Sequence, residues 1–385
     1  MVKKSVLWLH KWLGLLSGLV VFIVSLTGCI YVFYDDLKVV FYPEKYYIEE
    51  QSQHSLSAEA LPLSSLTDIA QQVLPKGEKV TRIDLYPAKN RTWIFRAVKT
   101  NEEALTYAGY FTYNKRVFID PYTGKVQAIE NSKTEFFQLV LQLHMNLLLG
   151  KKIGHTVVSV STILFLILTI TGLVLWWPKK WKIKTLKKGL SFDFSVKWKR
   201  LNYDLHNVLG FYSLLFALLL GFTGLLFSYP SLKEFYAEYF NKLSSDEGTA
   251  DKHFNIIPQK SPVSLNNALV YTLAKHPSAD IMSVRLKKNE DLHDIQVRLL
   301  KNRTGDFVWY YFNKQDGQIS KIKSSDETKV GDWLAGMNYD LHTGAFGGIF
   351  TKVLYFLASL VCASLPVTGF IIWLNKNKKT KKRRK

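Results

Sequence analysis

The chain has 385 residues, of which 48% are hydrophobic and 14% aromatic, a composition that excludes intrinsic disorder. Its formal net charge of +20 at pH 7 is typical of proteins that bind nucleic acids or anionic membranes. The only cysteines are Cys29 and Cys362, so the sequence offers no disulfide framework and no CxxCH motif for covalent haem.

Four apolar segments are long enough to cross a bilayer as helices, which takes about 20 residues. They are residues 13–34, 156–177, 207–229 and 348–374, and only the last contains a charged residue, Lys352. The first segment exceeds the apolar core of a signal peptide, and no cleavage motif follows it. The sequence therefore predicts a polytopic membrane protein.

Basic residues are concentrated in three segments that flank these spans, residues 1–12, 178–205 and 375–385. The three segments hold twenty Lys and Arg residues and only two acidic ones, Asp193 and Asp204. The positive-inside rule therefore predicts that both termini and the middle loop lie in the cytoplasm, with the long loops outside an inner (cytoplasmic) membrane. Because the membrane topology accounts for the excess of positive charge, the expected partner is the lipid bilayer, and no nucleic-acid partner is expected.

The second half of the chain repeats the first. Leu9-His10 recurs as Leu205-His206 and Leu143-His144 recurs as Leu341-His342, with offsets of 196 and 198 residues. Each histidine is accompanied by a Thr-Gly pair, and the pairs are Thr27-Gly28, Thr171-Gly172, Thr223-Gly224 and Thr368-Gly369. Repeats in membrane proteins often build a site between the two halves.

Each long outer loop has the pattern of one amphipathic helix followed by four short strands. The helices are expected at residues 66–74 and 265–273, and the strands at 80–86, 92–97, 116–119, 125–129, 281–286, 294–299, 307–312 and 318–322. A turn with glycine where a positive φ is expected precedes the last strand of each loop, at Gly124 and Gly317. We expect each loop to form a helix on a small antiparallel sheet, and neither contains a catalytic constellation.

The predicted fold class is a polytopic α-helical membrane protein. Its four-helix transmembrane bundle arises from an internal duplication and carries two small α+β extracytoplasmic domains. The predicted boundaries are 1–34 (N-terminus and first span), 35–143 (first outer domain), 144–177 (second span), 178–205 (basic loop), 206–230 (third span), 231–341 (second outer domain), 342–374 (fourth span) and 375–385 (basic tail).

Histidines at the ends of the predicted spans are the candidate site residues, because ionisable groups at membrane depth are costly and usually functional. The predicted topology places His10 and His206 at the inner boundary, and His144 and His342 at the outer one. Two imidazoles from different helices at one depth can ligate haem iron, one on each face. The other histidines outside the spans are His54, His253, His276 and His293, which lie in polar loop sequence and are expected to be solvated.

This pattern predicts two haem b groups near opposite membrane faces, because the 17 residues that separate His10 from Thr27 span about 25 Å of helix. Because the sequence has no CxxCH motif, haem would be held by iron coordination alone, without a covalent bond to the chain. The nearby Thr-Gly pairs provide either room for the flat macrocycle or close helix packing.

His155 complicates the outer site. It follows His144 by eleven residues, three turns along the same helical face, and its counterpart in the repeat is Lys352. Although His144 is favoured as the outer ligand, the sequence leaves open that His155 is the ligand, a third ligand or a partner for a haem propionate.

Other chemistries fit the sequence less well. Zinc usually requires three or four clustered nitrogen or sulfur ligands, and each boundary offers two or three histidines without a nearby cysteine. A transporter is disfavoured because no predicted span contains an acidic residue or a break in its middle. Since no GxGxxG after a strand and no GxxxxGK[ST] is present, electrons must come from a cytoplasmic reductase or a quinol.

The ordered set of motifs resembles the PepSY-associated transmembrane-helix family, which includes iron-regulated inner-membrane proteins and ferrisiderophore reductases. The resembling motifs are the four His and Thr-Gly pairs above, Gly154, Gly344, the tryptophans Trp176 and Trp373, and Val117-Phe-Ile-Asp120-Pro-Tyr-Thr-Gly124, which resembles the end of a PepSY domain. The resemblance spans nearly the full chain. At His155, where the family often has a basic residue, this sequence departs from the pattern.

The resemblance implies four spans, two PepSY-like outer domains and, as in the reductase members, two b-type haems that pass electrons to an iron chelate. We therefore expect a membrane haem-dependent oxidoreductase that reduces a ferric siderophore or another ferric chelate. The alternative is a non-enzymatic, membrane-anchored PepSY module whose outer domains bind peptide or envelope partners.

Overall fold

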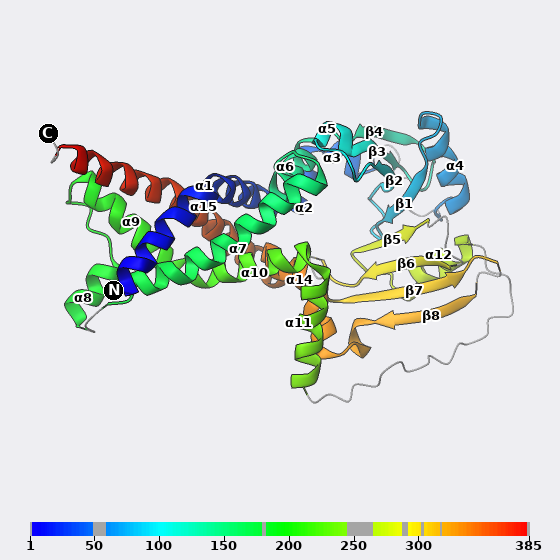
Figure 1. The fold of residues 1–385 in the computed structure, drawn as a ribbon. Coiled ribbons are helices and arrows are strands. Elements are labelled where there is room, and N and C mark those ends of the chain that lie inside the picture. The colour runs from blue at the N-terminus through cyan, green and yellow to red at the C-terminus, as the bar shows by residue number, and fades with distance from the viewer. Residues whose placement is uncertain are drawn as a thin grey trace.

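The molecule consists of a group of long apolar helices at one end and a β-sheet at the other (Figure 1). The computed structural model describes residues 2–48, 59–178, 182–244, 265–286, 292–301, 304–315 and 318–382. Two of the loop histidines, His54 and His253, and the turn at Gly317 lie outside the described residues.

Three helices are long and apolar enough to cross a membrane: α1 (Val2–Val32), α7 (Lys151–Trp176) and α15 (Gly348–Lys382). Helices α9 (Trp198–Tyr212) and α10 (Leu214–Ser228) together make a fourth candidate span, bent by 63° between them. These apolar helices are those of a membrane-embedded protein.

The bend between α9 and α10 contradicts the expectation that no span is broken. It falls at Ser213, which is buried and whose hydroxyl donates to the Gly210 carbonyl at 3.4 Å. Glycine and serine are common at sharp helix kinks. The apolar run continues through this point, so hydropathy alone reports one uninterrupted span.

His144 and His342 lie on separate short helices, which corrects the predicted boundaries of the second and fourth spans. His144 belongs to α6 (Phe136–Asn146), which is separated from α7 by Leu147 and Leu148, both with φ of 56°. His342 belongs to α14 (Asn338–Thr343), which ends at Gly344 with φ of 71°. The helices that carry His144 and His342 can therefore take directions of their own at the end of the bundle.

The remaining helices connect these elements. They are α2 (Tyr34–Phe41), α3 (Pro43–Tyr46), α4 (Leu63–Val73), α5 (Tyr107–Tyr110), α8 (Ile183–Leu190), α11 (Pro230–Leu243), α12 (Leu265–Lys275), α13 (Val330–Gly336) and the 3-10 turns η2 (Ser325–Glu327) and η3 (Ala345–Gly347).

The two outer domains share one eight-stranded antiparallel sheet, where the sequence analysis expected a small sheet in each. The strands are β1 (Val80–Leu85), β2 (Trp93–Thr100), β3 (Phe111–Ile119), β4 (Val126–Asn131), β5 (Ile281–Arg285), β6 (Leu292–Arg298), β7 (Phe307–Asn313) and β8 (Ile319–Ser324). Their order is β4-β3-β2-β1-β5-β6-β7-β8, so strands β1 and β5 join the halves edge to edge. Two separate sheets would each leave one of these strands as an exposed edge, and the pairing of β1 with β5 covers both.

Helices α4 and α12 cover one face of this sheet and form its apolar core. Leu66 and Ala70 of α4 and Ala268 of α12 are fully buried against strand residues such as Phe95 and Ile295. The predicted helices and all eight predicted strands are present, with ends that differ by several residues at most. The turn before β4 has Gly124 at φ of 74°, as the sequence predicts.

The buried cation of α15, Lys352, is paired. Lys352 is 3% exposed, and its Nζ lies 2.5 Å from Asp36 Oδ2 on α2. A charge at membrane depth requires such a partner, because its desolvation is otherwise uncompensated. The pair therefore ties α15 to the segment that follows α1.

Two candidate histidine sites

The structure brings the four principal histidines together as two pairs. The ring centroids of His10 on α1 and His206 on α9 are 6.3 Å apart, with ring planes at 87°. Those of His144 on α6 and His342 on α14 are 6.1 Å apart, with planes at 69°. One member of each pair comes from each half of the chain.

The pairs lie at opposite ends of the helical region. Helices α6 and α14 lie next to the sheet, whereas α9 and the N-terminal part of α1 lie at the far end (Figure 1). Helix α1 carries His10 and also Thr27, which contacts His144. The 17 residues between them correspond to about 25 Å of helix.

Each imidazole is held through Nδ1 by the threonine of one Thr-Gly pair. The Nδ1–Oγ1 distances are 2.9 Å for His10 and Thr171, 2.9 Å for His206 and Thr368, 3.2 Å for His144 and Thr27, and 2.8 Å for His342 and Thr223. In every case the histidine and the threonine come from different helices. Thr27 and Thr223 thus contact the His144–His342 pair, as the sequence predicts.

The threonine hydroxyls fix the tautomer of the histidines. Each hydroxyl donates to a carbonyl of its own helix, for example Thr171 to Ile167 at 2.8 Å and Thr223 to Leu219 at 2.6 Å. The oxygen is then an acceptor for Nδ1–H, and a backbone carbonyl also accepts, such as that of Val24 at 2.9 Å from His144 Nδ1. Since the proton is on Nδ1, Nε2 keeps its lone pair for a metal.

The glycine of each Thr-Gly pair makes room for an imidazole ring. A Cβ at Gly369 would lie 3.2 Å from Cε1 of His206, and one at Gly172 would lie 3.4 Å from Cε1 of His10. The distances at Gly28 and Gly224, to His144 and His342, are 3.4 and 3.5 Å. The sequence analysis assigned this room to a macrocycle or to general helix packing, whereas the structure gives it to the histidine itself.

Two asparagines belong to these sites and were missed by the sequence analysis. Asn202 Nδ2 donates to the carbonyl of Thr368 at 3.0 Å, and Asn338 Nδ2 donates to that of Thr223 at 3.2 Å. Each asparagine precedes a pair histidine by four residues, one turn of helix. The signal was present, because Asn-Tyr-Asp-Leu-His occurs twice, ending at His206 and His342.

His155 does not share a helix with His144. It lies on α7, partly exposed, beyond the helix break at Leu147 and Leu148, and its role at the outer site stays a prediction. The sequence analysis placed both residues on one helical face, and the helix break overturns that assumption. Of the remaining histidines in the described residues, His276 bonds Tyr310 at 2.7 Å and His293 lies on β6.

Burial keeps the outer imidazoles neutral. It lowers the pKa of His144 and, together with the neighbouring His144, lowers the pKa of His342 to about 3. A neutral imidazole is the form that binds a metal. Within the described ranges no group of three or more His, Cys, Asp or Glu side chains is arranged to hold a metal ion.

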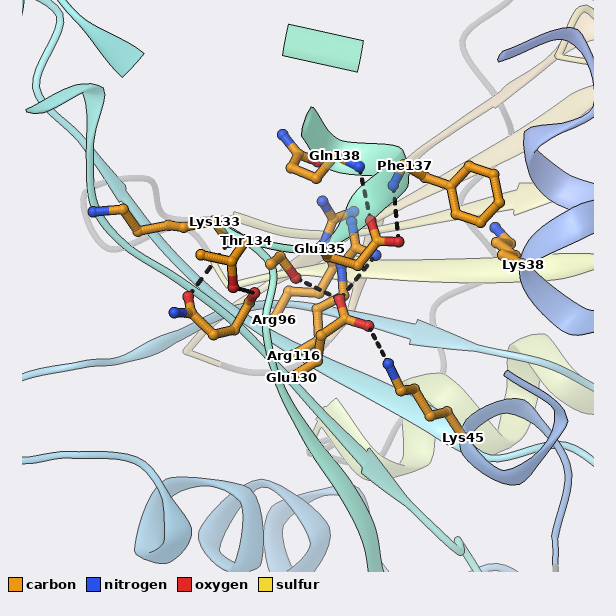
Figure 2. A network of polar contacts seen from close by, with 12 residues as sticks. Lys38, Lys45, Arg96, Arg116, Glu130, Lys133, Thr134, Glu135, Phe137 and Gln138 are labelled. Carbon is orange, nitrogen blue, oxygen red and sulfur yellow. Dashed lines mark hydrogen bonds and ion pairs between the residues drawn. The ribbon is translucent and has the colours of Figure 1, made fainter. Parts of the chain in front are cut away.

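Helices α6 and α14 are held by residues close to the sheet in sequence. The Glu135 carboxylate caps the start of α6 by accepting from the amides of Phe137 and Gln138, beside the contacts of Glu130 with Arg116 and Lys45 (Figure 2). On α14, Asp340 Oδ2 accepts from the Thr304 amide at 2.7 Å, in the segment before β7. The segments that follow β4 and precede β7 therefore position the helices that carry His144 and His342.

The fold and the two sites define a helical membrane protein with a β-sheet region and paired histidines at each end of its bundle. Comparison with protein families gives a match, over residues 7–376, to the family described as the PepSY-associated TM region. The chain belongs to this family, as its sequence motifs suggested. A search of curated proteins gave no match.

Proposed function

We propose that the chain is a di-haem b electron-transfer protein that passes electrons across the membrane to a ferric chelate. The observation that carries this proposal is the recurrence of one arrangement at both ends of the bundle. Each end has two facing histidines, each with its Nδ1 bonded to a threonine and with no hydrogen bond to its Nε2 from the described residues. Structural packing alone does not require the same tautomer at four positions.

The spacing of the rings fits an ion held between them. A metal–imidazole bond is about 2.0 Å long and the bonding nitrogen lies about 1.1 Å from the ring centroid, so two opposed imidazoles on one ion have centroids about 6.2 Å apart. The observed separations are 6.3 and 6.1 Å. His10 and His206 would hold one haem, and His144 and His342 the other.

The bound haems would supply one-electron chemistry at two depths, and the chain's own residues orient and tune them. The threonines fix the imidazole tautomer and direct Nε2 toward the iron. Hydrogen bonds from Nδ1–H make the imidazoles better electron donors, which favours ferric iron and lowers the reduction potential.

The direction of transfer follows from the charge distribution. The basic segments 1–12, 178–205 and 375–385 put the His10–His206 pair on the cytoplasmic side under the positive-inside rule. A cytoplasmic reductase or a quinol would donate electrons there. The pair His144–His342 would deliver them on the outer side, next to the sheet, to a ferric siderophore or a similar chelate.

This function is tested by the reduction of a ferric chelate outside proteoliposomes that contain an electron donor inside. We expect His10→Ala and His342→Ala each to reduce the rate at least 100-fold, because each removes an axial ligand from one of two haems in series. His155→Ala is the matched control and should retain the wild-type rate. Equal rates in all four proteins would favour the alternative of a non-enzymatic anchored PepSY module.

A further inference from the structure

A row of four arginines crosses the centre of the sheet. Arg116 on β3 pairs directly with Arg96 on β2. Arg96 also pairs with Arg82 on β1, and Arg82 pairs with Arg285 on β5. Directly opposite residues in antiparallel strands lie on the same face, with Cβ atoms about 5 Å apart. We call these four residues the arginine row; it spans the junction of the two halves.

The arginine row lies on the face of the sheet opposite α4 and α12, and residues of α2 and α3 cover the part of this face around Ile94 and Phe118. Alternation along the strands puts Phe95, Ala97 and Val284, which neighbour the arginines in sequence, in the core under α4 and α12. The side chains of Arg82, Arg96 and Arg285 are 39, 29 and 34% exposed, whereas that of Arg116 is 10% exposed. The side chains of Arg82 and Arg285 are therefore partly accessible to a ligand, and Arg96 lies between them and the buried Arg116.

The carboxylates near the row do not neutralise it. Arg82 Nε lies 2.7 Å from Asp84, which is also 3.4 Å from Arg96, and Arg285 Nε lies 2.7 Å from Asp294. The fourth partner, Glu130, lies 3.5 Å from Arg116 but is shared with Lys45 at 3.0 Å. The row thus has more cations than anions.

Arg96 is the least satisfied member of the row. Its Nε is buried and has no hydrogen-bond partner within the described part of the chain. Burial, with Arg116 and Arg82 on either side, lowers the pKa of Arg96. Like charges directly opposite one another destabilise a sheet, and a buried donor without an acceptor adds to the cost. An anion bound across the row would relieve both penalties.

Aromatic side chains continue the same face beyond Arg285. The Arg285 guanidinium lies 4.7 Å from the ring centroid of Trp309 on β7, and the rings of Trp309 and Tyr311 are 6.1 Å apart. Tyr311 is opposite Asp294, which is opposite Arg285. A ligand on this face therefore meets guanidinium groups and aromatic rings together.

We propose that the arginine row binds the ferric chelate that the protein reduces, and that this chelate is an anion with catecholate or carboxylate oxygens. The assignment rests on the proposed function. Guanidinium groups bind such oxygens through paired N–H donors, and the rings of Trp309 and Tyr311 offer stacking surfaces for catechol rings. The ferric ion of the chelate gains the one electron that the outer haem iron loses, and no bond to the protein forms or breaks.

The row is connected to the outer histidine pair through aromatic contacts. Tyr34 is hydrogen-bonded to Arg116, and its ring lies 5.5 Å from that of Phe137 on α6. Phe137 precedes His144 by seven residues of the same helix, about 10 Å. A chelate on the row is thus placed on the side of the sheet that leads to His144.

The test measures binding without electron transfer. The probe is the gallium(III) tris-catecholate complex, which is redox-inert and trianionic, titrated into the purified full chain by calorimetry. The double variant Arg82→Gln, Arg285→Gln is expected to bind at least 100-fold more weakly, about tenfold for each charged hydrogen-bond donor lost. The control Lys99→Gln removes an exposed cation from β2 near the core-facing side of the sheet and should bind as the wild type does.

Further outcomes separate this inference from the proposed function. Equal binding by the double variant, or equal binding of a neutral gallium(III) tris-hydroxamate complex, would overturn the proposal. Competition by inorganic phosphate at similar concentration would also overturn it, because the site would then be a phosphate site. The haem spectrum of the double variant should be the same as that of the wild type. A second double variant, Arg82→Lys, Arg285→Lys, keeps both charges; it should fold as the wild type does and recover part of the affinity for the probe. A wild type without haem that still binds the probe would contradict the proposed function alone.

Discussion

His206→Ala is expected to leave the purified protein with about half of the haem of the wild type. His10 then has no opposing imidazole, and a haem that is held by coordination alone is lost from that site. The outer pair, about 25 Å away along α1, keeps all its contacts with Thr27 and Thr223. The measurement is the haem-to-protein ratio, together with the redox-difference spectrum of the remaining haem.

The matched control for this variant is His155→Ala. His155 lies on α7, at the end of the helical region opposite to His206, and contributes to neither ring pair, so both haems should remain. Loss of all haem from His206→Ala would indicate a single shared site. Loss from His155→Ala comparable to that from His206→Ala would refute the assignment of the pairs.

Gly369→Val is expected to abolish haem binding at the inner site although no ligand is changed. The new Cβ would lie 3.2 Å from Cε1 of His206, and the two methyl groups of valine would fill the space of the imidazole. The ring must then turn away from His10, because the histidine and Gly369 lie on packed helices. Haem content should fall by about half, with the outer haem spectrum unchanged.

Gly210→Val is the control, since it makes the same substitution on α9, one turn after His206. A Cβ at Gly210 would meet only the Leu365 Cδ2 atom at 3.7 Å, an ordinary contact with the end of a flexible side chain. Full haem content in Gly369→Val would mean that the room beside His206 is not needed for ligation.

The sequence predicts the pairs well because their signal is local and repeated. Each of the four histidines follows a Leu and is matched by a Thr-Gly pair. Once the spans are placed in a bilayer, these positions predict which histidines face one another. The role of the glycines was not predictable, because the same glycine suits a macrocycle, a neighbouring helix or an imidazole. Only the crossing of α9 and α15 places Gly369 against His206.

Other features depend on contacts that no local pattern encodes. The alternation in β1 and β5 specifies which face is buried but not which strand lies at the edge, so the single sheet and its arginine row were not foreseen. The helix break at Leu147 and Leu148 places leucines at positive φ, which local sequence disfavours. That break puts His155 on a different helix from His144.

The most direct test of the two-haem account is the redox-difference spectrum of the wild-type protein, produced with ample haem and combined with a haem count. We predict a low-spin b-type spectrum, because two imidazoles ligate each iron and no CxxCH motif is present, with about two haems per chain. A folded, colourless protein under these conditions would contradict the account and leave only a membrane-anchored scaffold.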